Sequence, residues 1–301
     1  MNRHEFIDVA TITASSLFLR GGGFFSRSLE SDPIDDVVTD TVSTVGDIRP
    51  TTPREVTATG PAGEFHAGYL VHRWVGSDAP TLLYHHGSGE DPFDFGRFSS
   101  NTFERLFTAD SGFDLNLIAI RAPFHGGSSS DYVEAMGELE NFVGMLAAST
   151  ALMQALTERL RELGCPAVLA SGISLGGWVV NLHRAYYGSL DRYVPIFAGA
   201  RLDEVFGSSV YRKLVADSAR GRPEILAEAL DFEQDFVAVE ADDCDPILAR
   251  YDRIVEFETQ RPCYGGLEVD VLEKGHITGS LATDALRSHI RRSVSAVQHG
   301  P

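Results

Sequence analysis

The sequence predicts an α/β fold, with a mostly parallel sheet and helices on both of its faces. After one predicted hairpin, short apolar runs typical of buried strands alternate with helical patterns along most of the chain. Such alternation indicates parallel strands, because each connection between them needs a crossover long enough for a helix. The chain has 301 residues, 43% of them hydrophobic, which suffices for a sizeable core.

The N-terminal 53 residues are expected to form a helix and a polar connector. Residues 3–20 have an amphipathic pattern, and Gly21-Gly22-Gly23 would stop the helix. Residues 26–53 are rich in Ser, Thr, Asp and Pro, which is typical of a connector. The helix either docks on the main body, which would cover its apolar side chains, or mediates self-association into a homo-oligomer.

The main domain is predicted over residues 54–301 and starts with a hairpin. Its strands are residues 55–59 and 64–74, and Gly60-Pro61-Ala62-Gly63 supplies the turn. The later strands share short length and apolar character, and are predicted at 80–87, 115–120, 166–170, 192–198, 246–251 and 267–272.

Helices are predicted where apolar residues follow a helical spacing. They cover about 100–109, 131–163, 178–186, 203–237 and 281–297. The segment 131–163 is long enough for two helices with a break near Ser149, and Asp131 with Glu134 resembles a capping box at its start. Residues 203–240 lie between two strands and are a candidate lid.

The charge of the chain excludes some partners. Acidic residues outnumber basic ones by 43 to 25, and the formal net charge is −18. Nucleic acid and anionic membranes would be repelled, so neither is an expected partner. Lys213 and Lys274 are the only lysines, and an acidic surface with so little lysine fits a halophilic protein that works at high salt.

Two further patterns concern the compartment. Cys165, Cys244 and Cys263 are odd in number and widely spaced, which predicts free thiols in a reducing compartment, with no metal site. The apolar stretch 12–19 is too short to span a bilayer, and the acidic residues before it do not suit a secretory signal. The expectation is a cytoplasmic protein without stable membrane insertion.

Residues 172–176 have the pattern Gly-x-Ser-x-Gly between a predicted strand and a predicted helix. A strand, a tight turn and a helix in this order are the context of a nucleophile elbow. Such an elbow would place Ser174 at a strained backbone position with its hydroxyl exposed. Gly172 and Gly176 would leave room where strand and helix cross. The N–H of Leu175 would face the reacting oxygen. The alternative is a glycine-rich turn without a catalytic role.

A serine hydroxyl needs a base, and the base needs an anion to orient it. His276 follows the last predicted strand, after Gly275, which would permit a sharp turn; the alternative is a loop histidine bound to backbone. Asp252 follows the preceding strand and is the candidate acid. Asp203, which follows an earlier strand, is the competing candidate.

The sequence His85-His86-Gly87-Ser88-Gly89 follows another predicted strand. We expect the N–H of Ser88 to join that of Leu175 in an oxyanion hole, with the N–H of Gly89 as the alternative. The side chains of His85 and His86 are expected to support the loop. Residues that follow the next predicted strand are expected to line the pocket or pack on this loop: Arg121, Phe124, His125 and Gly126. Among them, His125 is a less favoured catalytic candidate.

Together, the segments 86–89, 172–177, 251–255 and 275–276 resemble the α/β-hydrolase superfamily over about residues 54–298. They look most like its esterase, dienelactone-hydrolase and acyl-peptidase branches. The resemblance implies an eight-stranded sheet with an antiparallel second strand. It also implies a catalytic triad and an oxyanion hole without cofactor or metal, formed by Ser174, Asp252, His276, Ser88 and Leu175. One position departs from the family, which often has glycine where Ala249 stands.

The leading hypothesis from the sequence is therefore a serine hydrolase. It would cleave a carboxylic ester, or a thioester or amide, of a small-molecule acyl substrate through an acyl-enzyme on Ser174. An acyltransferase would use the same triad. The alternative from another class is a non-catalytic binding protein on a hydrolase scaffold.

Overall fold

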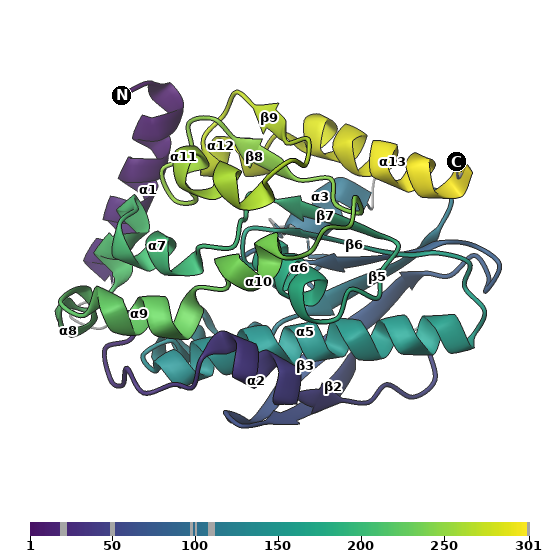
Figure 1. Ribbon diagram of the computed structural model, residues 1–301, viewed down its shortest axis with the longest axis horizontal. Helices are drawn as coiled ribbons and strands as arrows, with labels where there is room; N and C mark the ends of the chain where they lie inside the picture. Colours follow the sequence, from purple (N-terminus) through teal and green to yellow (C-terminus); the bar gives the residue numbers. More distant parts are fainter. Residues whose placement is uncertain (19–22, 49–51, 97–98, 100, 108–111, 300–301) are drawn as a thin grey trace.

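The computed structural model describes residues 1–18, 23–48, 52–96, 99, 101–107 and 112–299. Within these residues the strands form one sheet in the order β1-β2-β3-β5-β4-β6-β7-β8-β9 (Figure 1). Their bounds are β1 Val42–Ser43, β2 Arg54–Gly60, β3 Gly63–Arg73, β4 Thr81–His85, β5 Asn116–Arg121, β6 Val168–Ile173, β7 Arg192–Ile196, β8 Ile247–Ala249 and β9 Asp270–Leu272.

The sheet is parallel from β5 through β4 to β9, and antiparallel among β1, β2, β3 and β5. The expected antiparallel second strand of the main domain is confirmed as β3. The eight expected strands are present, and β1 adds a ninth at the edge. The carboxyl ends of β4, β6, β8 and β9 therefore point the same way, which brings the loops that follow them together.

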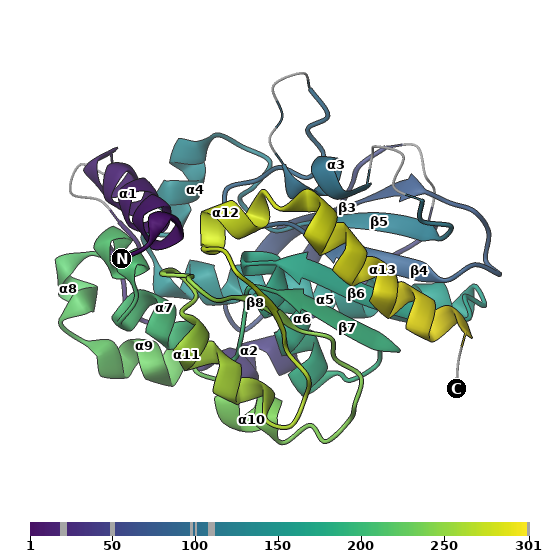
Figure 2. The ribbon, with the colours of Figure 1, turned by 90° about the horizontal axis from the view of Figure 1, so that it is seen from above.

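Helices cover both faces of the sheet (Figure 2). Their bounds are α1 Arg3–Phe18, α2 Ile34–Asp40, α3 Thr102–Phe107, α4 Ser129–Ala135, α5 Leu139–Glu162, α6 Leu175–Tyr186, α7 Leu202–Gly207, η1 Val210–Leu214, α8 Asp217–Arg220, α9 Pro223–Leu230, α10 Glu233–Val237, α11 Phe257–Gln260, η2 Arg261–Tyr264, α12 His276–Ser280 and α13 Thr283–His299.

The core is split by the sheet, as strand β4 illustrates. Leu83 points into the core under α5 and α6, whereas Leu82 and Tyr84 point into the opposite core under α3 and α13. Alternate residues of a strand face opposite sides, so a strand buried on both faces must be apolar throughout. This is why the apolar run 80–87 predicted a buried strand.

Residues 26–53, predicted as a polar connector, contain regular structure that the sequence analysis did not predict. Helix α2 and strand β1 lie within this segment, and Ile34, Val37 and Val38 of α2 are buried against α5. These three side chains share one face because they follow helical spacing. The segment is short and surrounded by polar residues, which conceals that spacing. Gly21 and Gly22, the predicted stop of the first helix, lie outside the described residues.

Two details of the segment 131–163 are wrong. The break lies between α4 and α5, at residues 136–138, and Ser149 is buried in the middle of α5. The capping box is formed by Ser128 and Asp131: the Ser128 hydroxyl accepts from the Asp131 N–H, and the Asp131 carboxylate accepts from the Ser128 N–H. The N-cap therefore lies three residues before the predicted one.

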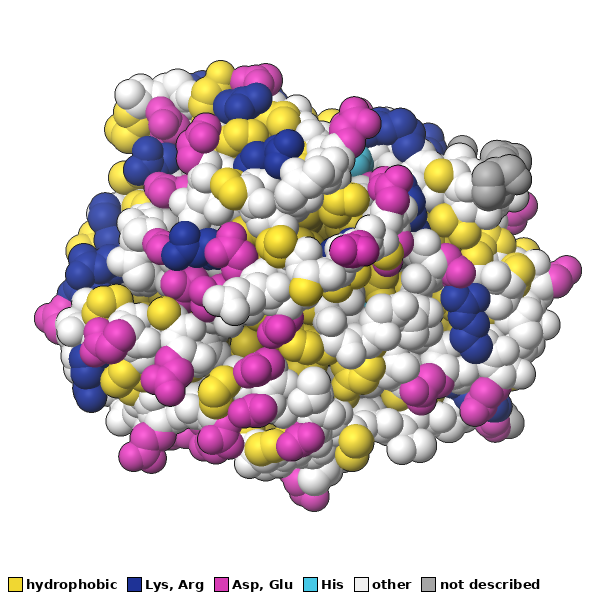
Figure 3. Space-filling view, viewed as in Figure 1, with side chains coloured by type: hydrophobic (Ala, Val, Ile, Leu, Met, Phe, Trp, Pro, Cys, Tyr) yellow, Lys and Arg dark blue, Asp and Glu magenta, His cyan; other side chains and the backbone are white. Residues whose placement is uncertain are grey.

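Acidic side chains are spread over the face seen in Figure 3, and Lys and Arg side chains lie in fewer, separate groups. No helix among the described residues is both long enough and apolar enough to cross a membrane. All three cysteines are free and buried.

Candidate active site

Ser174 lies between β6 and α6 with φ 53° and ψ −112°. A positive φ is unfavourable for a residue with a side chain and persists only where the surroundings enforce it. Here the Ser174 N–H donates to the Ile196 carbonyl at 2.8 Å, and its carbonyl accepts from the Trp178 N–H at 3.0 Å. Strand, strained serine and helix form the predicted elbow geometry.

Two glycines let this turn pack closely. A Cβ on Gly172 would lie 2.3 Å from the carbonyl oxygen of Gly176, in α6. A Cβ on Gly176 would lie 2.2 Å from the carbonyl oxygen of His85, at the end of β4. Both distances are far below van der Waals contact, so side chains at these positions would force the strand, helix and loop apart.

His276 contacts both other predicted members of the triad. Its Nε2 lies 3.0 Å from Ser174 Oγ, and its Nδ1 lies 2.6 Å from Asp252 Oδ2. The carboxylate can only accept, so Nδ1 carries the proton and Nε2 is free to accept from the serine hydroxyl. Burial lowers the pKa of His276, but the charge and hydrogen bond of Asp252, together with the charge of Asp8, outweigh it and raise the pKa above its ordinary value.

The turn before His276 differs from the expectation. Gly275 has φ −91° and ψ −176°, an extended conformation open to any residue, so glycine is not needed for a sharp turn there. Its absent side chain matters for space instead, since a Cβ would lie 2.7 Å from Asp8 Oδ2.

Asp252 is held in place by its other carboxylate oxygen. Its Oδ1 accepts from the N–H groups of Ile254 and Val255 at 2.8 and 2.7 Å. The turn closes with Ala249 where the family often has glycine, and the Asp252 N–H points to the Ala249 carbonyl at 3.4 Å. The buried side chain is therefore fixed toward His276 by backbone on one side and imidazole on the other.

Asp203, the competing acid, lies in the first turn of α7 and is not the carboxylate that binds His276. Its charged neighbours are Asp231, Arg201 and Glu204. Burial, with the charge of Asp231, raises the pKa of Asp203 to about 6. The structure thus pairs Asp252, rather than Asp203, with the histidine.

The loop after β4 is anchored by neutral histidines. His125 Nε2 accepts from the Gly89 N–H at 3.2 Å, and its Nδ1 lies 2.9 Å from the Pro123 carbonyl. His86 Nε2 accepts from the Ala122 N–H at 3.0 Å. Burial lowers the pKa of His125 to about 4, so it is neutral at pH 7 and both ring nitrogens are engaged. Through these contacts His125 supports the loop after β4.

The same loop leaves one donor near the serine. The N–H of Gly89 is taken by His125, whereas no backbone hydrogen bond of the described residues uses the N–H of Ser88 or Leu175. Ser88 and Leu175 both line the cavity that contains Ser174. Both N–H groups are therefore candidates for the predicted oxyanion hole.

Arg121, Phe124 and Gly126 do not line the cavity that contains Ser174. The Arg121 guanidinium stacks on Phe93 and is paired with Glu55 and Asp91. Phe124 packs edge-on against a core phenylalanine, and a Cβ on Gly126 would press on the Arg121 guanidinium.

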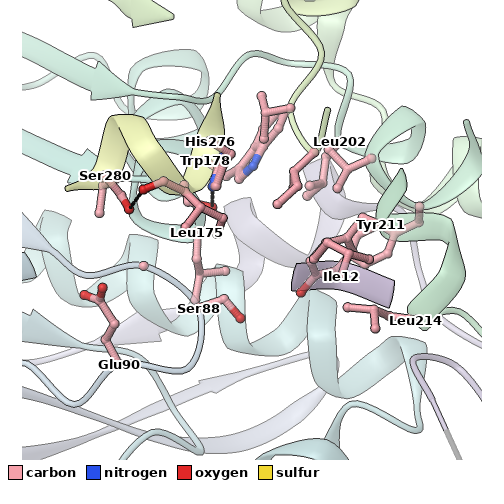
Figure 4. Close-up of a pocket in the computed structure, with 18 of the residues that line it drawn as sticks. Ile12, Ser88, Glu90, Leu175, Trp178, Leu202, Tyr211, Leu214, His276 and Ser280 are labelled. Carbon is pink, nitrogen blue, oxygen red and sulfur yellow. Dashed lines mark hydrogen bonds between the residues drawn. The ribbon is translucent and has the colours of Figure 1, made fainter. Parts of the chain in front are cut away.

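The cavity over Ser174 has a volume of about 280 Å³. Figure 4 shows Ile12, Leu202, Tyr211 and Leu214 together on one side of His276, and Glu90 and Ser280 on the other. Leu202, Tyr211 and Leu214 come from α7 and η1, within or beside the segment predicted as a lid. The apolar walls of the cavity can exclude water from one side of Ser174.

No protein-family model matches the chain, and no curated protein matches its sequence. Solved structures do match its fold. Acetyl xylan esterase 1 from Thermoanaerobacterium sp. JW/SL YS485 superposes with a TM-score of 0.52 at 14% identity, over 91% of this chain and 98% of that one. The chain has the α/β-hydrolase fold.

Two further α/β-hydrolase structures show how far the likeness extends. Acetyl xylan esterase from Paenibacillus sp. R4 has a TM-score of 0.55 at 15% identity and covers 98% of this chain and 95% of its own. Pyrococcus horikoshii acylaminoacyl peptidase has a TM-score of 0.56 at 13% identity over 84% of this chain. This chain spans only 42% of that peptidase. The order Ser174, Asp252, His276 is the chain order of α/β-hydrolase triads.

Sequence reasoning missed the side chains that α1 brings to the site. Asp8 binds the turn that carries His276, and Ile12 and Ser15 line the cavity. Their spacing of four and three residues places them on one face of the helix, which is the signal that could have identified this face as the one that docks. It could not have identified the surface that the face meets.

Proposed function

We propose that this protein is a serine hydrolase that cleaves carboxylic esters, or thioesters or amides, of small acyl substrates. The observation that carries the proposal is the continuous chain of contacts from Ser174 Oγ to His276 (3.0 Å) and from His276 to Asp252 (2.6 Å), starting at a strained elbow. A strained serine, aligned with a histidine and a fixed carboxylate, suits nucleophilic catalysis.

The proposed reaction has two halves. Ser174 Oγ attacks the acyl carbon while its proton passes to His276 Nε2, and the N–H groups of Ser88 and Leu175 stabilise the resulting oxyanion. The intermediate collapses, and the departing alcohol takes the proton from Nε2. Water then gives a proton to Nε2 and attacks the acyl-enzyme, and its collapse returns the proton to Ser174 and releases the carboxylic acid. An acyltransferase would use another nucleophile in place of water.

The cavity supports an apolar acyl group. Side chains from α1, α6, α7 and η1 form an apolar wall beside Ser174, including Ile12, Trp178, Leu202 and Leu214. The structures with a similar fold include two acetyl xylan esterases and an acylaminoacyl peptidase, and their names do not decide the substrate here. The apolar wall favours acyl chains longer than acetyl, since each buried methylene contributes about 0.8 kcal/mol.

The test uses p-nitrophenyl esters of increasing chain length and a fluorophosphonate that labels reactive serines. Wild-type protein is expected to turn over these esters, with kcat/KM rising beyond acetate, and to be labelled at Ser174. Ser174→Ala should lose turnover by a factor on the order of 10⁶ and lose labelling, with an unchanged unfolding temperature. Ser295→Ala, at an exposed position on α13, is the matched control. Absence of both labelling and turnover in the wild type would instead identify a non-catalytic binding protein.

A further inference from the structure

Asp8 is a fully buried carboxylate on the N-terminal helix α1. Its Oδ2 accepts from the N–H of His276 at 2.8 Å and from the N–H of Arg253 at 3.2 Å. Its Oδ1 accepts from the N–H of Ile277 at 3.0 Å. A single side chain therefore binds the backbone of the candidate base and the residue that follows the candidate acid.

These N–H groups need a partner that their own segment does not supply. His276 and Ile277 open the short helix α12, where the first N–H groups have no intrahelical acceptor. A helix of this kind is usually capped by the side chain of the preceding residue, which here is Gly275 and has none. Asp8 supplies the missing acceptors from 268 residues away.

Gly275 is the counterpart of Asp8. Its backbone conformation is open to any residue, yet a Cβ there would lie 2.7 Å from Asp8 Oδ2 and 3.0 Å from the His4 carbonyl. A side chain at position 275 would therefore not fit, because α1 approaches so closely. Docking of α1 and the shape of the histidine turn depend on one another.

Further contacts of α1 reach the same turns. His4 Nδ1 lies 2.8 Å from Thr278 Oγ1, and Glu5 is 3.7 Å from the Arg253 guanidinium. Ile12 lines the cavity, whereas Asp8 does not. Asp8 therefore contacts the backbone that carries His276 and follows Asp252, and it does not contact the cavity proposed to bind substrate.

We propose that Asp8 is a positioning residue of the catalytic triad, which holds the His276 turn and the Asp252 turn in register through their backbone N–H groups. This inference rests on the proposed hydrolase function. Without these bonds both turns can shift, and misplacement of a catalytic group by about 1 Å can cost on the order of 10²-fold in rate.

The charge of Asp8 gives this role a distinct signature. Asp252 and Asp8 are the carboxylates that raise the pKa of His276, against the effect of burial. Other charged or titratable groups at these turns include Glu5, Arg253, His4, Glu256 and Lys274. Removing the charge of Asp8 should lower the pKa of His276, so the acid limb of kcat/KM should move to lower pH.

The experiment compares Asp8→Asn with Asp36→Asn, the same change at an exposed position on α2. Ester turnover is measured over a range of pH, with active protein counted by fluorophosphonate labelling. For Asp8→Asn we expect kcat per labelled site to fall about 10- to 100-fold with little change in KM, and the acid limb to move to lower pH. Asp36→Asn should match the wild type.

A second variant keeps the test decisive if Asp8→Asn does not fold. Gly275→Ala should displace the carboxylate and lower kcat, and it should cost much less in an Asp8→Ala background, where the oxygen it would meet is gone. Unchanged kcat and an unmoved acid limb in Asp8→Asn, or additive effects in this pair, would overturn the inference. A wild type without turnover or labelling would overturn the proposed function instead.

Discussion

Asp252 and Asp203 show how two buried carboxyl groups near one site acquire different properties. Asp252 accepts from His276 through one oxygen and from two backbone N–H groups through the other. Asp203 has a buried oxygen, Oδ1, for which the described residues provide no hydrogen-bond partner, and burial with the charge of Asp231 raises its pKa to about 6. The first is arranged to orient a base, whereas the second is costly to ionise.

Exchanging each carboxylate for an amide separates these roles. Asp252→Asn should reduce kcat on the order of 10⁴-fold, because the amide cannot hold His276 in the required tautomer. Asp203→Asn should leave kcat near the wild-type value. The larger loss identifies the acid, and a greater effect of Asp203→Asn on ester turnover would contradict the pairing in the structure.

Asp203→Asn also has an expected effect on stability. Because the folded pKa of about 6 lies above the usual value for an aspartate, ionised Asp203 opposes folding above that pH. Removing the charge should raise the unfolding temperature at pH 8, and the gain should shrink as pH falls through about 6 toward the unfolded value. Thermal unfolding of both proteins across this range measures it, and an equal shift at every pH would contradict the assignment.

At the scale of elements, α2 and β1 tie the N-terminal segment to the main sheet. Val38 of α2 is fully buried, while Val42 of β1 is 67% exposed. Val38→Ala should lower the free energy of unfolding by about 1.5–3 kcal/mol, whereas Val42→Ala should change it by less than about 0.5 kcal/mol. Denaturant unfolding followed by circular dichroism compares the two. Equal small effects would show that the segment folds separately from the core.

The same elements mark the limit of prediction from the sequence. The central strands and the elbow follow from local patterns: continuous apolar runs, and a serine between glycines at a strand–helix junction. The partners His276, Asp252 and Ser88 follow from their places at strand ends. Helix α2 and the role of Asp8 could not be predicted from the sequence. A short apolar face, or a single acidic residue on a helix, has a role only through contact with a surface that is distant in the sequence. The same holds for Gly275, whose absent side chain makes room for another segment.

At the scale of the whole molecule, the dominant feature is a formal net charge of −18. The screening length falls from about 10 Å at 0.1 M salt to about 3 Å at 1 M, so molar salt suppresses repulsion between neighbouring acids. It also weakens exposed ion pairs such as Arg27–Glu134, but these contribute only about 0–1 kcal/mol each. Since acids exceed bases by 43 to 25, repulsion is the larger of the two effects.

Molar potassium chloride is therefore expected to stabilise the folded protein. In a chain of this size each kcal/mol of relieved repulsion raises the unfolding temperature by about 2–4 °C, so a rise of several degrees should appear between dilute buffer and molar salt. Sucrose, which is excluded from protein surfaces without screening charge, is the control for general solute effects. Most of the rise should already occur by a few tenths molar salt, as screening requires. An unfolding temperature that does not rise with salt, or rises equally with sucrose, would show that the acidic surface is not destabilising at low salt and would remove the basis for a halophilic protein.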